Sequence, residues 1–121
     1  MKYGKRARKR RPTSAKAALM AAADLIETCG LSVGAYERHG SYCVIGALRH
    51  VAGETVTHQA IHRISTYLLA RSQYARGYVR NATPHVVVVD WSDNARSKRR
   101  VAAVLRKVAG LGAATITAGR S

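Results

Sequence analysis

Phenylalanine is absent from this chain of 121 residues, and tryptophan occurs only once, as Trp91. Large aromatic side chains therefore cannot fill the core, and most of the apolar content is Ala and Val. We expect a core of small side chains between closely packed helices, in which Trp91 is unusually important for packing. The length fits one domain, which can be stable without a metal or a disulfide.

Cysteine is scarce, and long apolar runs are missing. Cys29 and Cys43 are the only cysteines, and the basic start of the chain continues into an Ala-rich segment rather than into the apolar block of a signal peptide. We therefore expect a cytoplasmic protein in a reducing compartment, without a disulfide. No apolar run approaches the ~20 residues that span a bilayer, so no membrane partner is predicted.

Acidic residues are few, since six Asp and Glu accompany 21 Lys and Arg, and the formal net charge is +15. Residues 1–12 contain seven cations and no acid, and residues 96–121 again contain seven cations and no acid. Residues 17–95 are formally neutral, with six arginines and six acidic residues. An excess of this size at both ends is more than solubility requires and indicates contact with a polyanion.

Composition divides the chain into one domain and two flanking segments. Residues 1–12 repel one another and offer little to bury, so we expect a disordered basic arm there. Residues 13–110 form a single helical domain. Residues 111–121 are a tail rich in Gly, Ala and Thr, for which the sequence predicts no element.

Capping residues and apolar periodicity predict about four helices. Ser14 is suited to cap the first helix, and Gly30 to stop it. Ser41 is suited to cap the second, and Ser92 or Asp93 the last. Three glycines without helical period between residues 30 and 40 indicate an ordered loop. The helices are expected over about residues 15–29, 42–51, 55–76 and 93–109.

Val86 to Val89 give the one strand signal, because four β-branched residues follow Pro84. A lone strand cannot satisfy its own backbone, so it needs a partner in the loop at residues 31–37 or in a second copy, as a homodimer. The predicted fold class is mainly α, with about four helices, one short β element at Val86–Val89 and a disordered basic N-terminal arm.

Four short motifs occur in order along the chain, and they read Ala22-Ala23-Asp24-Leu25-Ile26-Glu27, Gly34-Ala35-Tyr36-Glu37-Arg38, Cys43-Val44-Ile45-Gly46-Ala47-Leu48 and Trp91-Ser92-Asp93 with Arg96. Across residues 18–108 this order resembles an uncharacterised family of small actinobacterial and actinophage proteins. Ser92 departs from the Asn of the family pattern. The resemblance implies a phage or actinobacterial accessory protein, and it implies no mechanism.

The two basic ends favour non-enzymatic binding to DNA, RNA or a ribonucleoprotein. Cations that neutralise phosphates release condensed counterions, which gives tight and salt-sensitive binding without sequence specificity. The alternative is a tail that only solubilises or localises the protein. Because the last helix has no Asn or Gln suited to reading adenine, we expect contacts to phosphate rather than to bases. The expected contact residues are Lys5, Arg6, Arg8, Lys9, Arg10, Arg11, Arg96, Arg99, Arg100 and Lys107.

Aromatic and cationic residues alternate between Tyr67 and Arg80. Tyrosines in such a segment can stack on unpaired bases while arginines hold phosphates, which suits RNA or single strands. Ordinary packing of Tyr67 and Tyr74, with their hydroxyls at the surface, is the slightly favoured alternative.

A second hypothesis is a protein-binding module that modifies a host complex. In that case the neutral middle of the chain carries the specificity, and the basic arm adds affinity for an acidic partner.

A third hypothesis is a thiol enzyme with Cys43 as nucleophile, because the start of a helix lowers the pKa of a thiol. Asp90 or Asp93 would orient the base in such a site. No nucleophile signature surrounds Cys43, so no catalytic residue is predicted. The candidate bases are His39, His50 and His85.

Four residues have the types and partly the spacing of a zinc site, since His58 and His62 lie one helical turn apart and Cys29 and Cys43 complete a Cys2His2 count. The cysteines are too far apart in sequence for such a site, and both occupy apolar helical positions. We therefore predict neither a metal nor another cofactor.

Trp91 and Asp93 have a structural interpretation, in which Trp91 closes the core and Asp93 caps the next helix. The functional alternative is a binding lip in which Tyr36 and Arg38 meet Trp91 and Asp93, with Arg38 paired to Asp93.

Overall fold

The computed structural model describes residues 11–32, 37–38, 40–70 and 83–111. The described part is mainly α-helical, as predicted, with five helices and one short hairpin. Residues 1–10 of the arm predicted at residues 1–12, Tyr36 and residues 112–121 lie outside it.

Helix α2 spans Ala15–Cys29 and confirms the first predicted helix. The hydroxyl of Ser14 accepts a hydrogen bond from the N–H of Ala17 at 3.1 Å, and the N–H of Gly30 closes the helix on the carbonyl of Ile26 at 2.8 Å. Leu19 and Ile26 lie on its fully buried face.

A short hairpin follows, with β1 at Glu37–Arg38 and β2 at Ser41–Tyr42. The strands are antiparallel, with Arg38 opposite Ser41, and Gly40 takes a positive φ of 84° in the turn. The N–H of Tyr42 also donates to the carbonyl of Gly30 at 3.0 Å. Part of the loop predicted at residues 30–40 therefore forms β1, and β2 occupies residues 41–42, which were predicted to cap and begin the second helix.

Two helices come next, α3 at Val44–Val51 and α4 at Glu54–Leu69. Cys43 rather than Ser41 is the N-cap of α3, so the prediction placed this helix two residues too early. The buried hydroxyl of Thr57 donates to the carbonyl of Leu48 at 3.3 Å and joins α4 to α3. The third helix was predicted to reach residue 76, and its last residues lie outside the described chain.

The strand predicted at Val86–Val89 is wrong, because these residues belong to α6, Pro84–Asn94. The hydroxyl of Thr83 caps this helix by accepting from the N–H of Val86 at 3.3 Å, and Pro84 occupies the first turn, where its missing N–H costs nothing. Val87, Val88 and Trp91 are buried on one side of the helix. Their burial against neighbouring helices outweighs the local β preference of valine. The homodimer expected from an unpaired strand loses its basis.

The last helix, α7, spans Lys98–Gly110. Ser97 caps it by accepting from the N–H of Arg100 at 3.3 Å, so the start predicted at Ser92 or Asp93 was too early. Val101, Leu105 and Val108 are buried and form the apolar stripe with which α7 packs on the core.

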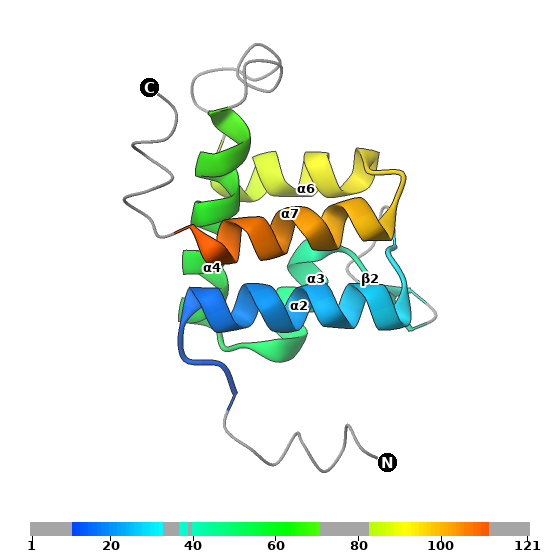
Figure 1. Ribbon diagram of the computed structural model, residues 1–121, viewed down its shortest axis with the longest axis horizontal. Helices are drawn as coiled ribbons and strands as arrows, with labels where there is room; N and C mark the ends of the chain where they lie inside the picture. The colour runs from blue at the N-terminus through cyan, green and yellow to red at the C-terminus, as the bar shows by residue number, and fades with distance from the viewer. Residues whose placement is uncertain (1–10, 33–36, 39, 71–82, 112–121) are drawn as a thin grey trace.

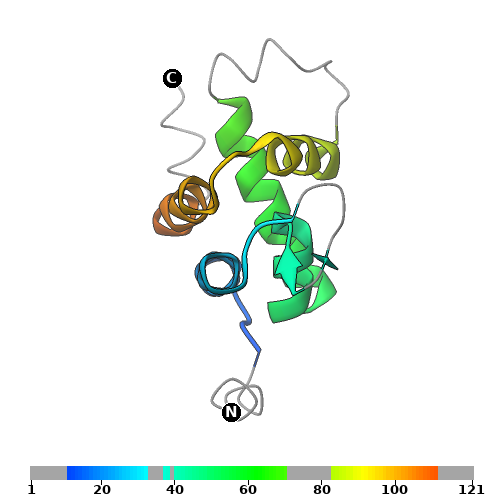
Figure 2. The ribbon, with the colours of Figure 1, turned by 90° about the vertical axis from the view of Figure 1, so that its right-hand side faces the viewer.

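The axes of α2, α6 and α7 are nearly parallel, and α4 crosses them at one end (Figure 1). In Figure 2 the three helices are seen almost end-on, with α3 close to α2 and α4 behind them. The core between these helices is built from aliphatic side chains. Its largest fully buried members include Leu19, Ile26, Ile45, Leu48, Ile64 and Leu105. Among the described helices, none has both the length and the apolar character that crossing a membrane requires.

Candidate functional site

The N-terminal turn of α7 carries the densest charge of the described chain. Lys98, Arg99 and Arg100 are consecutive and exposed, and this turn contains no acidic residue. Within the part of the chain that the structure describes, none of the three forms an ion pair with a carboxylate. Cations are unfavourable at the positive end of a helix dipole, whereas an anion is favoured there. The arrangement therefore gains from an anion supplied by another molecule.

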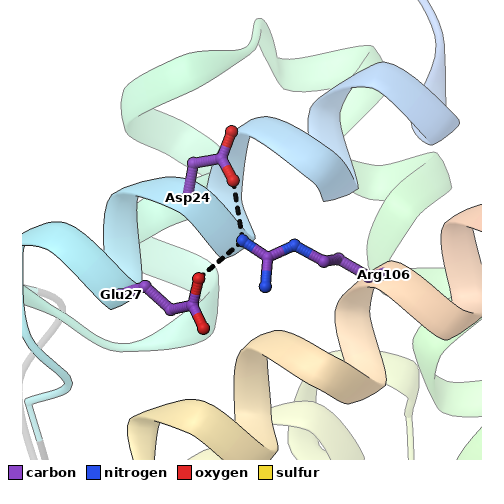
Figure 3. A network of polar contacts seen from close by, with 3 residues as sticks. All are labelled: Asp24, Glu27 and Arg106. Atoms are coloured by element: carbon purple, nitrogen blue, oxygen red, sulfur yellow. Dashed lines mark hydrogen bonds and ion pairs between the residues drawn. The ribbon is translucent and has the colours of Figure 1, made fainter.

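Arg106, two turns further along α7, is occupied by an intramolecular contact. Its Nη2 donates to Oδ1 of Asp24 and to Oε1 of Glu27, both at 2.7 Å (Figure 3). The hydrogen bond from Arg106 lowers the pKa of Glu27, and the pair of carboxylates raises the pKa of Arg106 still further above its usual value. Arg106 therefore joins α7 to α2 and is not counted among the available cations.

A groove of about 640 Å³ lies beside this basic turn, between α6, α7 and the C-terminal end of α4. Its lining has an apolar part, which includes Trp91, Leu68 and Val104, and a polar part at the loop between α6 and α7. Arg96 and Arg100 line the groove, and Arg99 does not. The full lining is Tyr67, Leu68, Trp91, Asn94, Ala95, Arg96, Ser97, Arg100, Val101 and Val104.

The groove assembles residues that the sequence did not group together. Trp91 and Asp93 were predicted to form a lip with Tyr36 and Arg38. The structure instead places Trp91, which is 8% exposed, in the groove with Arg96 and Arg100. Tyr36 and the side chain of Arg38 lie outside the described residues, so the predicted lip and its ion pair stay predictions.

The other predicted cations occupy three different settings. Lys107 is exposed on α7, two turns after Arg100. Arg11 caps the C-terminus of α3, because its Nη2 lies 3.3, 3.1 and 3.2 Å from the carbonyl oxygens of Arg49, His50 and Ala52. This structural contact was not foreseen. The remaining predicted arm residues, Lys5, Arg6, Arg8, Lys9 and Arg10, lie outside the described chain.

Cys43 is buried at the N-terminus of α3, and its Sγ accepts from the N–H of Gly46 at 3.4 Å. Burial raises the pKa of the Cys43 thiol, and the charge of Asp93 raises it as well. The lowering expected from the helix start is smaller than the cost of burying a thiolate. This environment favours a neutral thiol and does not support the thiol-enzyme hypothesis.

The cysteines and histidines of the Cys2His2 count lie in different environments. Cys29 is exposed and Cys43 is buried. His58 contacts the Glu54 carboxylate at 2.9 Å, one turn earlier on α4. Among the residues that the structure describes, no three His, Cys, Asp or Glu side chains gather into a metal-binding group.

Residues 10–111 match the model of a protein family that is described as a family of unknown function (DUF6197). No curated protein and no solved structure matches the chain. The chemistry of the site therefore has to be argued from this chain's own residues.

Proposed function

The chain belongs to DUF6197, a family of unknown function, and we propose that it binds nucleic acid without catalysing a reaction. The arm cations Lys5, Arg6, Arg8, Lys9 and Arg10 and the basic surface of α7 anchor phosphates electrostatically, whereas Arg11 caps α3. The observation that carries the proposal is the first turn of α7, where Lys98, Arg99 and Arg100 are exposed, the turn itself contains no acid, and none of the three forms an ion pair within the described chain.

The position of these cations favours anion binding over simple solubilisation. A solubilising surface needs charge but does not need to concentrate it at the one end of a helix where cations repel the backbone dipole. Phosphates at this end of the helix would meet the cations of its first turn and the positive end of the helix dipole. Each phosphate contact also releases counterions, which favours binding most strongly at low salt.

The biological setting is part of the proposal. The order of the sequence motifs favours an accessory protein of an actinobacterium or its phage, acting in the bacterial cytoplasm. DNA, RNA and a ribonucleoprotein all present the required phosphates.

The test measures binding of the purified, nuclease-treated protein to duplex DNA, single-stranded DNA and structured RNA across a salt series. We expect log Kd to depend linearly on log salt concentration, with a slope of several units. Deletion of residues 1–10 should reduce the slope. The deletion ends before Arg11, because Arg11 caps α3.

A second variant replaces Lys98, Arg99 and Arg100 with Gln and should reduce the slope by about three units, since each phosphate contact contributes about one. Lys16→Gln on α2 is the matched control for the loss of an exposed cation elsewhere, and it should change the slope little. Weak binding of all three nucleic acids without a salt slope would overturn the proposal and point to a protein partner with an acidic surface.

A further inference from the structure

We propose that the groove between α6 and α7 receives an unpaired nucleotide of a single-stranded nucleic acid. This inference rests on the proposed function and specifies its substrate class. The base would enter the apolar part of the groove, and its phosphate would lie at Arg96 and Arg100.

The groove has the two chemical halves that a nucleotide requires. Tyr67 and Val104, which are half-buried, supply most of the apolar surface that a flat base can reach, and the largely buried Trp91, Leu68 and Val101 complete the apolar lining. Aromatic rings bind every base by stacking, because each base has a π face, so this recognition tolerates different sequences. The volume of about 640 Å³ lies within the roughly 300–1,000 Å³ typical of small-molecule sites.

Charge complementarity selects a nucleotide over other apolar ligands. Arg96 and Arg100 are both exposed and lie on either side of Ser97, the N-cap of α7, while no acidic residue lines the groove. A purely apolar protein segment would leave these cations without a partner. A nucleotide places a phosphate next to its base and satisfies both halves of the groove.

Base accessibility distinguishes a single strand from a duplex. In a duplex the faces of the bases are stacked on one another, and only their edges reach the grooves of the helix. A single strand can turn a base into a protein groove at much lower cost. The basic turn of α7 alone would bind both forms, whereas the groove adds affinity only for the single strand.

Trp91 is the only tryptophan, so its fluorescence reports directly on the groove. The probes are oligo(U), oligo(dT), a duplex DNA, inorganic polyphosphate and a polyglutamate peptide. We expect oligo(U) and oligo(dT) both to quench Trp91, with any difference between them reporting the combined contribution of the ribose 2′-OH and the thymine methyl group. Duplex DNA and polyphosphate should bind at low salt without quenching, because neither presents an accessible base.

Arg99 and Arg100 provide a matched pair of variants, since they are adjacent, exposed and equal in charge, and only Arg100 lines the groove. Arg100→Gln should weaken binding of oligo(U) more than Arg99→Gln does. Both variants should weaken binding of duplex DNA equally, because that binding depends on charge alone.

Filling the groove tests the base site without removing charge. Val104→Phe should weaken binding of oligo(U) about tenfold, as expected for the loss of a stacked base, and leave duplex binding unchanged. Ala95→Leu fills the same groove from the loop and serves if Val104→Phe does not fold. Met20→Phe, at an exposed position on α2, is the control for added aromatic bulk.

The outcomes separate this inference from the proposed function. If the protein bound none of the nucleic acids in a salt-sensitive way, the proposed function itself would be wrong. Equal binding of single strands and duplex, no quenching of Trp91, and equal effects of Arg99→Gln and Arg100→Gln would overturn the groove site and leave the function standing. Quenching by polyglutamate but not by oligonucleotides would overturn it in favour of an acidic protein segment.

Discussion

Ser92, in α6, accepts a hydrogen bond from the backbone N–H of Val44, the first residue of α3, at 3.2 Å. Both residues are fully buried. The first N–H groups of a helix have no partner within it, so a side chain from another helix here satisfies the N–H of Val44, in addition to the local cap that Cys43 provides for Gly46. Two motifs that lie far apart in the sequence, at residues 43–48 and 91–93, therefore meet at one helix terminus.

Ser92→Ala should lower the free energy of unfolding by about 1–3 kcal/mol, because the N–H of Val44 would stay buried without an acceptor. Urea denaturation measures the loss, and hydrogen exchange of the Val44 amide localises it. Ser14→Ala is the control, because it removes an exposed cap on α2. It should change exchange of the Val44 amide no more than its effect on global stability requires. Unchanged stability of Ser92→Ala would contradict the structural role of this hydrogen bond.

Gly30→Ala should lower the free energy of unfolding by about 1–3 kcal/mol, because Gly30 has a φ of 103° that other residues rarely adopt. A Cβ atom there would also lie 2.7 Å from Oγ of Ser41, whose hydroxyl donates a hydrogen bond to the carbonyl of Cys29. Thermal or urea unfolding measures the effect. Gly53→Ala is the control, since Gly53 has a φ of −76° and open space where a Cβ would lie. Ala is a weaker N-cap than Gly, but it also reduces the entropy of the unfolded chain, and these opposite effects should leave the variant nearly neutral. Equal stabilities of the two variants would refute the argument from backbone strain.

The helices that could be predicted are those whose own residues signal their ends. Ser14 and Gly30 signal both ends of α2, whereas the start of α7 was predicted too early because Ser97, and not Ser92 or Asp93, caps it. In contrast, the local pattern of Val86 to Val89 favours a strand, and only burial against other helices makes this segment helical.

The cations of the candidate site were visible in the sequence, but the groove was not. Its lining depends on where the ends of α4 and α6 meet the start of α7, so Tyr67, Trp91 and Arg100 come together only in the folded chain. The docking of Arg11 on the end of α3 depends on tertiary structure in the same way. Sequence periodicity identifies the buried face of each helix and carries no information on the angle at which two helices cross.

The ion pairs of Arg106 predict a pH dependence with a defined sign. Because Arg106 lowers the pKa of Glu27 below its ordinary value of 4.5, the unfolded chain binds a proton more readily than the folded chain. The contribution of Glu27 to stability is therefore present above that value and is lost as the pH falls through the lower, folded-state pKa. Arg106→Gln should have a lower melting temperature than the parent at neutral pH, and the two should converge in acid.

Thermal unfolding from neutral pH to about pH 3 measures this convergence. Glu27→Gln is the control, since it removes the titrating group and should flatten the same part of the profile. A difference between the parent and Arg106→Gln that does not change with pH would show that the pair does not couple protonation to folding.

The two cysteines should differ strongly in their reaction with iodoacetamide at neutral pH. Cys29 is exposed and should react readily, whereas burial of Cys43 raises its thiol pKa and blocks access to Sγ. In a Cys29→Ser variant, which leaves Cys43 alone, we expect alkylation only at the rate at which the protein opens, with full reaction in denaturant. Mass spectrometry of the modified protein over time measures both rates. Rapid alkylation of Cys43 in the folded variant would contradict its neutral, buried state and return the thiol-enzyme hypothesis to consideration.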